Sequence, residues 1–185
     1  ATLARLEEGV SGIQLFENSS LLPAPYYAAR LPEPVSVHTG FTRLENMLIR
    51  ALEPVVERNP VRGRSLLLVS TTKGNIGSIR GGKPAPDAFL PQMASNVARF
   101  FGFSETPWVL SNACVSGILA VAVAKRVIDA GAFDSVYVVA GDEVTEFVLS
   151  GFAGFQALSS GPCRPYDKSR DGVTLGEAAA AVLVS

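Results

Sequence analysis

Uninterrupted apolar runs alternate with helical patterns through the middle of the chain. Runs at residues 66–69, 108–110 and 136–139 are apolar at every position, which is typical of strands buried on both faces of a parallel sheet. Residues 88–101 and 118–129 lie between these runs and are predicted to be helices. The resulting βαβαβ order predicts an α/β fold, whose crossovers should be right-handed.

The flanking regions add further elements to this pattern. Residues 42–45 read Thr-Arg-Leu-Glu, a capping box that opens an amphipathic helix to about Arg58. Residues 178–184 are predicted to form a final strand. Residues 1–12 resemble the tail of a helix, and residues 18–34, rich in Pro, Ser and Ala, are predicted to be irregular.

Composition and net charge argue against several classes of function. The chain has 185 residues, enough for one domain with a sizeable core, and a net charge of −1 without a basic patch. We therefore expect no nucleic-acid partner. The apolar runs are shorter than a membrane span and no signal peptide is visible, so no membrane partner is expected either. The two cysteines and the single histidine are widely separated, which argues against a zinc site or a disulfide framework and favours a cytoplasmic setting.

The strongest candidate for chemistry is Cys114. It precedes the run at residues 118–124, which has no polar face and is predicted to be a helix buried nearly all round, ending near Gly131. Cys114 should therefore lie at or just before the N-terminus of this helix. Free backbone N–H groups and the helix dipole favour a thiolate there, and a thiolate is a nucleophile for acyl groups. The alternative is a buried structural cysteine.

From residue 111 onwards the chain resembles the N-terminal half of a β-ketoacyl synthase, a condensing enzyme of the thiolase fold. Motifs similar to those of the family occur in the family's order at residues 111–117 (around Cys114), 151–152 with 156–159, 164–172, and 176–179. The resemblance implies that residues 1–185 form a thiolase-like N-terminal βαβαβ half, with a mostly parallel sheet flanked by helices.

The same resemblance implies a chemistry. Cys114 would accept an acyl group from acyl carrier protein as a thioester and condense it with a decarboxylating malonyl unit on a second carrier. The backbone N–H of Cys114 would be one oxyanion donor. No cofactor and no metal are implied. Family members form homodimers, or heterodimers with a related synthase. Phe152 and Phe155 either border the acyl pocket or belong to an ordinary core.

Several features depart from the family pattern. The two catalytic histidines of the family lie in a C-terminal half, and the single histidine here, His38, matches neither. The family's first strand also has no counterpart before Ala1. We therefore expect a fragment of a longer enzyme that does not condense substrates alone. Residues 140–144 read Ala-Gly-Asp-Glu-Val, where the family usually has Ala-Gly-Gly-x-Glu, which leaves the acyl-chain length open.

Two other functions remain possible from the sequence. One is a non-catalytic, synthase-like partner subunit of the chain-length-factor type, although such subunits usually replace the nucleophile. The other is a thiolase-like acyltransferase that uses coenzyme A.

Two charged clusters have structural interpretations. Asp142, Glu143 and Glu146 could bind a metal, but a solvated loop is the favoured interpretation. Within residues 164–171, two arginines and two aspartates are predicted to hold a turn through mutual ion pairs and hydrogen bonds.

Overall fold

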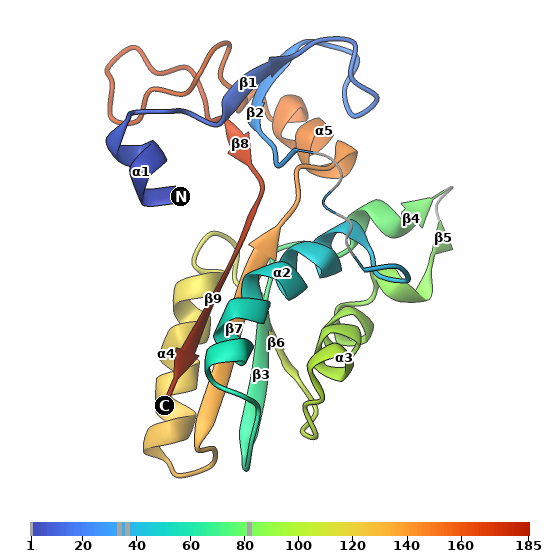
Figure 1. The fold of residues 1–185 in the computed structure, drawn as a ribbon. Helices are drawn as coiled ribbons and strands as arrows, with labels where there is room; N and C mark the ends of the chain where they lie inside the picture. Colours follow the sequence, from blue (N-terminus) through green and yellow to red (C-terminus); the bar gives the residue numbers. More distant parts are fainter. Residues whose placement is uncertain (1, 33–34, 36–37, 81–82) are drawn as a thin grey trace. The chain divides into compact units, whose positions relative to one another are not determined.

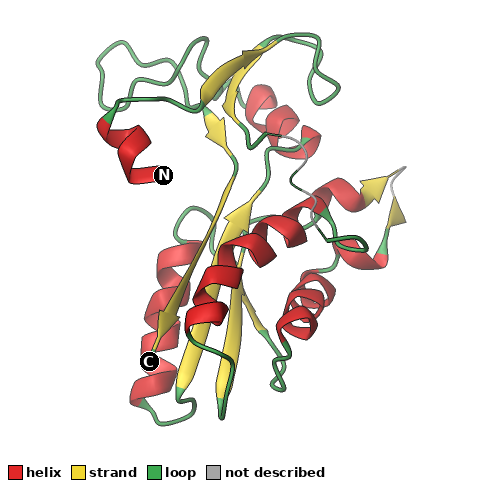
Figure 2. Cartoon of the chain, in the orientation of Figure 1, coloured by secondary structure: helices red, strands yellow, loops and turns green. Residues whose placement is uncertain are grey.

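The chain folds into two compact units. In a computed structural model, residues 2–32, 35, 38–80 and 83–185 are described. Unit 1 comprises Ala1–Leu31 and Glu143–Glu177, and unit 2 comprises Pro32–Asp142 and Ala178–Ser185. Figure 1 labels the helices and strands, and Figure 2 distinguishes them by colour. Each unit has its own sheet and is described by itself.

Unit 2 is built on a four-stranded sheet in the order β6-β3-β7-β9. Its central strand β3 pairs in parallel with β6 and β7, while β9 pairs antiparallel with β7. Ser70 lies opposite both Leu110 and Ala140, so the three parallel strands end at one edge of the sheet. The predicted mostly parallel sheet is confirmed. The strands are β3 (Ser65–Ser70), β6 (Trp108–Leu110), β7 (Ser135–Asp142) and β9 (Ala178–Val184).

Helices cover both faces of this sheet (Figure 2). Alternate residues of a strand point to opposite faces, and the buried strands therefore supply two cores. On one face, Leu67 and Val69 pack with α2 (Arg43–Arg58) and α3 (Leu90–Phe101). On the other, Leu66 and Leu68 pack with α4 (Ser116–Asp129). The short elements η1 (Ile76–Ser78), β4 (Ile79–Arg80), β5 (Lys83–Pro84) and η2 (Pro86–Ala88) connect β3 to α3.

The predicted capping box opens α2. The Thr42 side chain accepts a hydrogen bond from the Glu45 N–H (3.2 Å), and the Thr42 N–H donates to the Glu45 carboxylate (2.8 Å). Two N–H groups that the helix leaves without partners are satisfied in this way. Pro54 lies inside the helix without ending it. Gly131, with φ 68°, follows α4 as predicted for a C-terminal glycine.

Unit 1 contains a second, smaller sheet that the sequence did not reveal. Strands β1 (Ile13–Phe16), β2 (Tyr26–Ala29) and β8 (Leu175–Gly176) pair in that order. The prediction of irregular chain over residues 18–34 is wrong for β2; residues 33 and 34 lie outside the described residues. β2 has four residues and pairs with the equally short β1 and with β8, which is distant in sequence. Segments this short gave no clear periodic pattern. The unit also contains α1 (Thr2–Glu7) and α5 (Glu146–Gly154).

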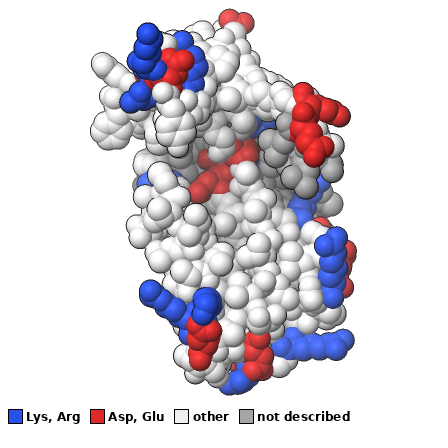
Figure 3. All heavy atoms as spheres, turned by 90° about the vertical axis from the view of Figure 1, so that its left-hand side faces the viewer, with Lys and Arg blue, Asp and Glu red and all other residues white. Residues whose placement is uncertain are grey.

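The prediction that α4 is buried nearly all round is wrong for this chain. Only Ser116, Ala120 and Ala124 are buried, while Ile118 is 80% exposed. The sheet of unit 2 covers one side of the helix, and the described chain supplies no second layer for the other side. The lower part of Figure 3 shows this face of the unit, on which uncharged side chains predominate between charged groups near its ends. Among the described residues, no helix is both long and apolar enough to cross a bilayer.

Candidate active site around Cys114

Cys114 lies in the connection between β6 and α4. β6 ends at Leu110 and α4 begins at Ser116, with Val115 as its N-cap residue. The prediction that Cys114 falls just before the helix N-terminus is therefore confirmed. The residue is exposed, so the alternative of a buried structural cysteine is wrong. The first N–H groups of a helix lack acceptors within it, and they and the helix dipole stabilise negative charge that develops nearby.

The turn before Cys114 is strained and locked by one side chain. Ala113 has φ 45°, a left-handed conformation that costs an L-residue roughly 1–2 kcal/mol. The Ser116 hydroxyl accepts a hydrogen bond from the Asn112 N–H (2.7 Å) and donates to the Ala113 carbonyl (2.6 Å). The Ser116 N–H donates to the same carbonyl (3.2 Å). Ser116 therefore holds both sides of the turn that presents Cys114.

The first turn of α4 rests on the sheet. A Cβ atom built on Gly117 would lie 3.5 Å from the Cβ of Ala140 in β7, which is ordinary van der Waals contact. The start of α4 and the Cys114 turn thus lie at the edge where β6, β3 and β7 end. In open α/β sheets this edge is where ligands and reacting groups collect.

Of the three acidic residues at the end of β7, Asp142 is the last residue of the strand, and Glu143 and Glu146 follow it. The favoured interpretation as a solvated loop is wrong for Asp142. Its half-buried carboxylate accepts hydrogen bonds from the chain after β3, because β3 and β7 end side by side. Among the described residues, no three His, Cys, Asp or Glu side chains are grouped as metal ligands.

The predicted turn in unit 1 is held by its own charged groups. The Asp171 carboxylate accepts hydrogen bonds from the Ser160 hydroxyl and N–H and from the Ser159 hydroxyl (2.7 Å). These bonds lower the pKa of Asp171, with that from the Ser160 hydroxyl contributing most. Arg164 lies 4.0 Å from Asp171 and donates to the Ser169 carbonyl (2.6 Å). The structural interpretation of this cluster is confirmed in part: the charged groups do hold the turn, but their hydrogen bonds go to serine and backbone groups and not to one another.

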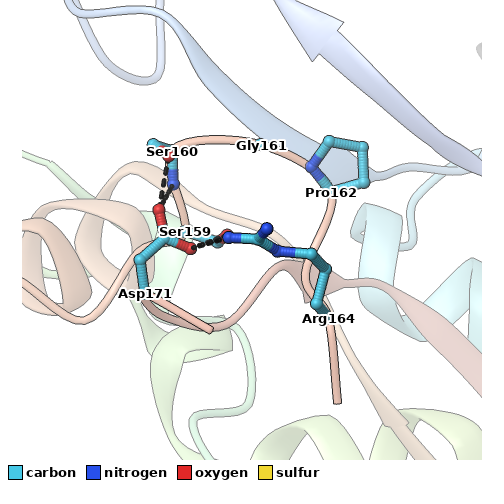
Figure 4. A pocket seen from close by; sticks show the side chains of 6 residues that line it. All are labelled: Ser159, Ser160, Gly161, Pro162, Arg164 and Asp171. Carbon is cyan, nitrogen blue, oxygen red and sulfur yellow. Dashed lines mark hydrogen bonds and ion pairs between the residues drawn. The ribbon is translucent and has the colours of Figure 1, made fainter. Parts of the chain in front are cut away.

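A cavity of about 330 Å³ lies beside this turn. Figure 4 shows Arg164 and Asp171 facing one another across it, with Asp171 bonded to Ser160. The charged groups that line the cavity thus already have partners in the turn. The lining residues are Ser159, Ser160, Gly161, Pro162, Arg164 and Asp171.

Two residues of the sequence motifs have structural roles that the sequence reasoning did not assign. A Cβ atom on Gly172 would lie 2.5 Å from the backbone of Leu158 and of Ser159, so this position requires glycine. Glu177 is buried and accepts hydrogen bonds from the N–H groups of Leu31 (2.7 Å) and Val144 (3.2 Å). The motifs at residues 164–172 and 176–179 therefore include residues that hold unit 1 together.

The remaining candidates lie elsewhere. Phe152, in α5, is 38% exposed, and Phe155, which follows the helix, is 86% exposed. Phe155 is therefore not a core residue of unit 1, and neither phenylalanine lines the cavity in Figure 4. His38 Nε2 lies 3.0 Å from the Glu53 carboxylate. Glu53 belongs to α2, so this contact joins His38 to that helix within unit 2.

Comparison with known proteins identifies the family of this chain. Residues 67–185 match the sequence model of the N-terminal domain of β-ketoacyl synthases. Nodulation protein E of Rhizobium leguminosarum bv. trifolii is 32% identical over 117 residues, which are 63% of this chain and 28% of that protein. The 3-oxoacyl-[acyl-carrier-protein] synthase 2 of Vibrio cholerae is 26% identical over 176 residues, which are 91% of this chain and 38% of that protein.

A solved structure agrees on the fold. A ketosynthase from Xenorhabdus doucetiae, determined in complex with its chain length factor, superposes with a TM-score of 0.73 at 21% identity. The match covers 93% of this chain and 50% of that one. The chain thus has the thiolase-like fold of ketosynthases and spans half or less of the length of these relatives. It belongs to the β-ketoacyl synthase family, as the match to the family's N-terminal domain shows.

Proposed function

We propose that residues 1–185 are the N-terminal half of a condensing β-ketoacyl synthase in which Cys114 is the nucleophile. The observation that carries the proposal is the exposed position of Cys114, on a strained turn immediately before α4. An exposed sulfur at a helix N-terminus has access to a substrate, and the helix dipole stabilises negative charge that develops there during the reaction. Membership of the family supplies the reaction type.

In the first half-reaction, the Cys114 thiolate attacks the carbonyl carbon of an acyl thioester on acyl carrier protein. A carbon–sulfur bond to Cys114 forms, and the bond to the carrier's sulfur breaks. The carrier leaves as a thiol after taking up the proton that Cys114 gave away. The backbone N–H of Cys114 and the helix N-terminus would stabilise the negative oxygen of the tetrahedral intermediate.

In the second half-reaction, a malonyl group on another carrier loses carbon dioxide and becomes an enolate. Its carbon attacks the acyl-Cys114 carbonyl, the new carbon–carbon bond forms, and the Cys114 thiolate leaves. The loss of carbon dioxide drives this step. The proposal needs no cofactor, and it leaves the histidines of the family's C-terminal half outside these residues.

We also propose acyl carrier protein as the carrier of the substrate, a dimeric state and a cytoplasmic location. The name of the Vibrio cholerae relative specifies acyl carrier protein, and this supports an acyl-carrier substrate here. A dimer, either of identical subunits or with a related synthase, is part of the proposal, since the Xenorhabdus relative was solved with a chain length factor. We place Phe152 and Phe155 at the acyl-chain side of the site, and the enzyme in the cytoplasm.

The test uses the intact protein. Incubation with an acyl carrier protein thioester should add the acyl mass to Cys114, as read by peptide mass spectrometry, and cerulenin or iodoacetamide should block it. Cys114→Ala should abolish acylation and condensation, whereas Cys163→Ala should retain both. Condensation that persists in Cys114→Ala contradicts the proposal. An unacylated Cys114 would favour a non-catalytic partner subunit, and acylation only by acyl-coenzyme A would favour a thiolase-like enzyme.

A further inference from the structure

The edge of the sheet that carries Cys114 is built from three neighbouring strand ends. Leu110, Ser70 and Ala140 lie in register across β6, β3 and β7. Ser111 follows β6 and Thr71 follows β3, while Gly141 and Asp142 are the last two residues of β7. The Cys114 turn, the chain after β3 and the end of β7 are therefore neighbours within unit 2.

The Asp142 carboxylate accepts several hydrogen bonds from the residues that follow β3. One of its carboxylate oxygens, Oδ1, accepts hydrogen bonds from the Thr71 hydroxyl (2.8 Å), the Thr72 hydroxyl (2.8 Å) and the Thr72 N–H (2.9 Å). The Thr72 N–H also lies 3.2 Å from Oδ2. The Thr71 hydroxyl in turn accepts from the Gly74 N–H (3.0 Å). Hydrogen bonds to a charged acceptor are the stronger kind, so this carboxylate fixes the segment after β3.

The segment that Asp142 fixes lies against the start of the Cys114 turn. The Ser111 hydroxyl is 3.5 Å from the Thr72 carbonyl oxygen, a long contact that shows proximity more than strength. Ser111 lies two residues before Ala113, whose backbone is strained. A strained backbone persists only where its surroundings determine it fully. Ser116 constrains this turn from the helix side, and the segment at Thr72 borders it from the sheet side.

We propose that Asp142 is a positioning residue for Cys114. By holding Thr71 and Thr72 at the end of β3, it fixes the segment that borders the Cys114 turn. The proposal rests on the proposed nucleophilic role of Cys114. Asp142 itself contacts no reacting atom. In Asp142→Asn the amide oxygen can replace Oδ1, but the charge is lost, so the hydrogen bonds from Thr71 and Thr72 become weaker neutral ones. The NH₂ group in place of Oδ2 would face the Thr72 N–H, from which it cannot accept a hydrogen bond. The segment then relaxes, and Cys114 spends less time in the reactive geometry.

The experiment compares Asp142→Asn with Asp134→Asn in the intact protein. Asp134 precedes β7 at its opposite end and pairs with the exposed Arg64, so it matches the chemical change without touching the site. The readouts are the iodoacetamide alkylation rate of Cys114 and the single-turnover acylation rate at saturating acyl carrier protein. We expect Asp142→Asn to lower both rates about fivefold at unchanged KM, and Asp134→Asn to change neither.

A second pair of variants separates positioning from folding. Thr72→Ser retains the hydroxyl that Asp142 binds and should react at the wild-type rate, whereas Thr72→Val loses it and should slow as Asp142→Asn does. A merely structural role would lower the fraction of active sites in a burst titration and leave the rate per site unchanged. That result, or a wild-type rate in Asp142→Asn, overturns the proposal. Normal alkylation of Cys114 without any acylation in the wild-type protein would instead refute the proposed function.

Discussion

Replacing Ala113 by glycine should stabilise unit 2, whereas alanine-to-glycine substitutions usually destabilise a protein. Ala113 is exposed and holds φ 45° in the turn before Cys114. Its methyl group therefore contributes little packing, while its Cβ makes the left-handed conformation unfavourable. Glycine adopts this conformation without that cost.

The magnitude follows from two opposing terms. Relief of the left-handed conformation is worth about 1–2 kcal/mol. The greater conformational freedom of glycine in the unfolded chain offsets about 0.5–1 kcal/mol of that stabilisation. We therefore expect Ala113→Gly to raise the free energy of unfolding by about 0.5–1 kcal/mol. Ala122, exposed in the middle of α4, is the matched control, and Ala122→Gly should lower it by about 1 kcal/mol.

Urea unfolding followed by tryptophan fluorescence measures both variants. Trp108, the single tryptophan of the chain, lies in β6 and reports on unit 2. The two variants should differ by about 1.5–2 kcal/mol in opposite directions from wild type. If Ala113→Gly destabilises the protein as much as Ala122→Gly does, the strain assigned to the turn is absent.

Two further predictions concern unit 1. Hydrogen bonds lower the pKa of Asp171 in the folded protein, so its contribution to stability is present above the ordinary aspartate pKa of about 3.9 and lost as the pH falls through the folded value. The melting temperature of Asp171→Asn should therefore lie below that of wild type at pH 7, with the gap narrowing below about pH 4; a gap that is constant with pH contradicts this. Gly172→Ala should cost more than about 2 kcal/mol, because its Cβ would meet backbone atoms at 2.5 Å, whereas Gly154→Ala, with open space around it, should be tolerated in thermal melts. Equal stability of the two alanine variants would contradict this prediction, because it would show that the backbone near Leu158 shifts to make room for the new Cβ atom.

The elements that the sequence predicted well are those whose signal is local. The runs at residues 66–69 in β3 and 136–139 in β7 are apolar at every position because helices cover both faces of these strands. The capping box of α2 lies within four consecutive residues. The position of Cys114 before α4 followed from the same kind of pattern. Strand β2 could not be predicted because it and its neighbour β1 have only four residues each, too few for a clear pattern. The role of Asp142 could not be predicted because its hydrogen-bond partner Thr71 lies far away along the chain. The burial of α4 was overestimated because apolar composition does not say what covers a helix.

The antiparallel pairing of β7 with β9 has a consequence for how this fold can vary. Asp142 lies opposite Ala178 at the end of the ladder, so the chain departs from the sheet and rejoins it at adjacent points. Residues 143–177 therefore form a connection that leaves the sheet and returns to it at neighbouring positions. Lengthening such a connection costs little, since each doubling of a flexible loop adds only about 0.6 kcal/mol of closure entropy. Evolution can therefore remodel the stretch that bears Phe152 and Phe155 while the strand order beneath Cys114 stays the same.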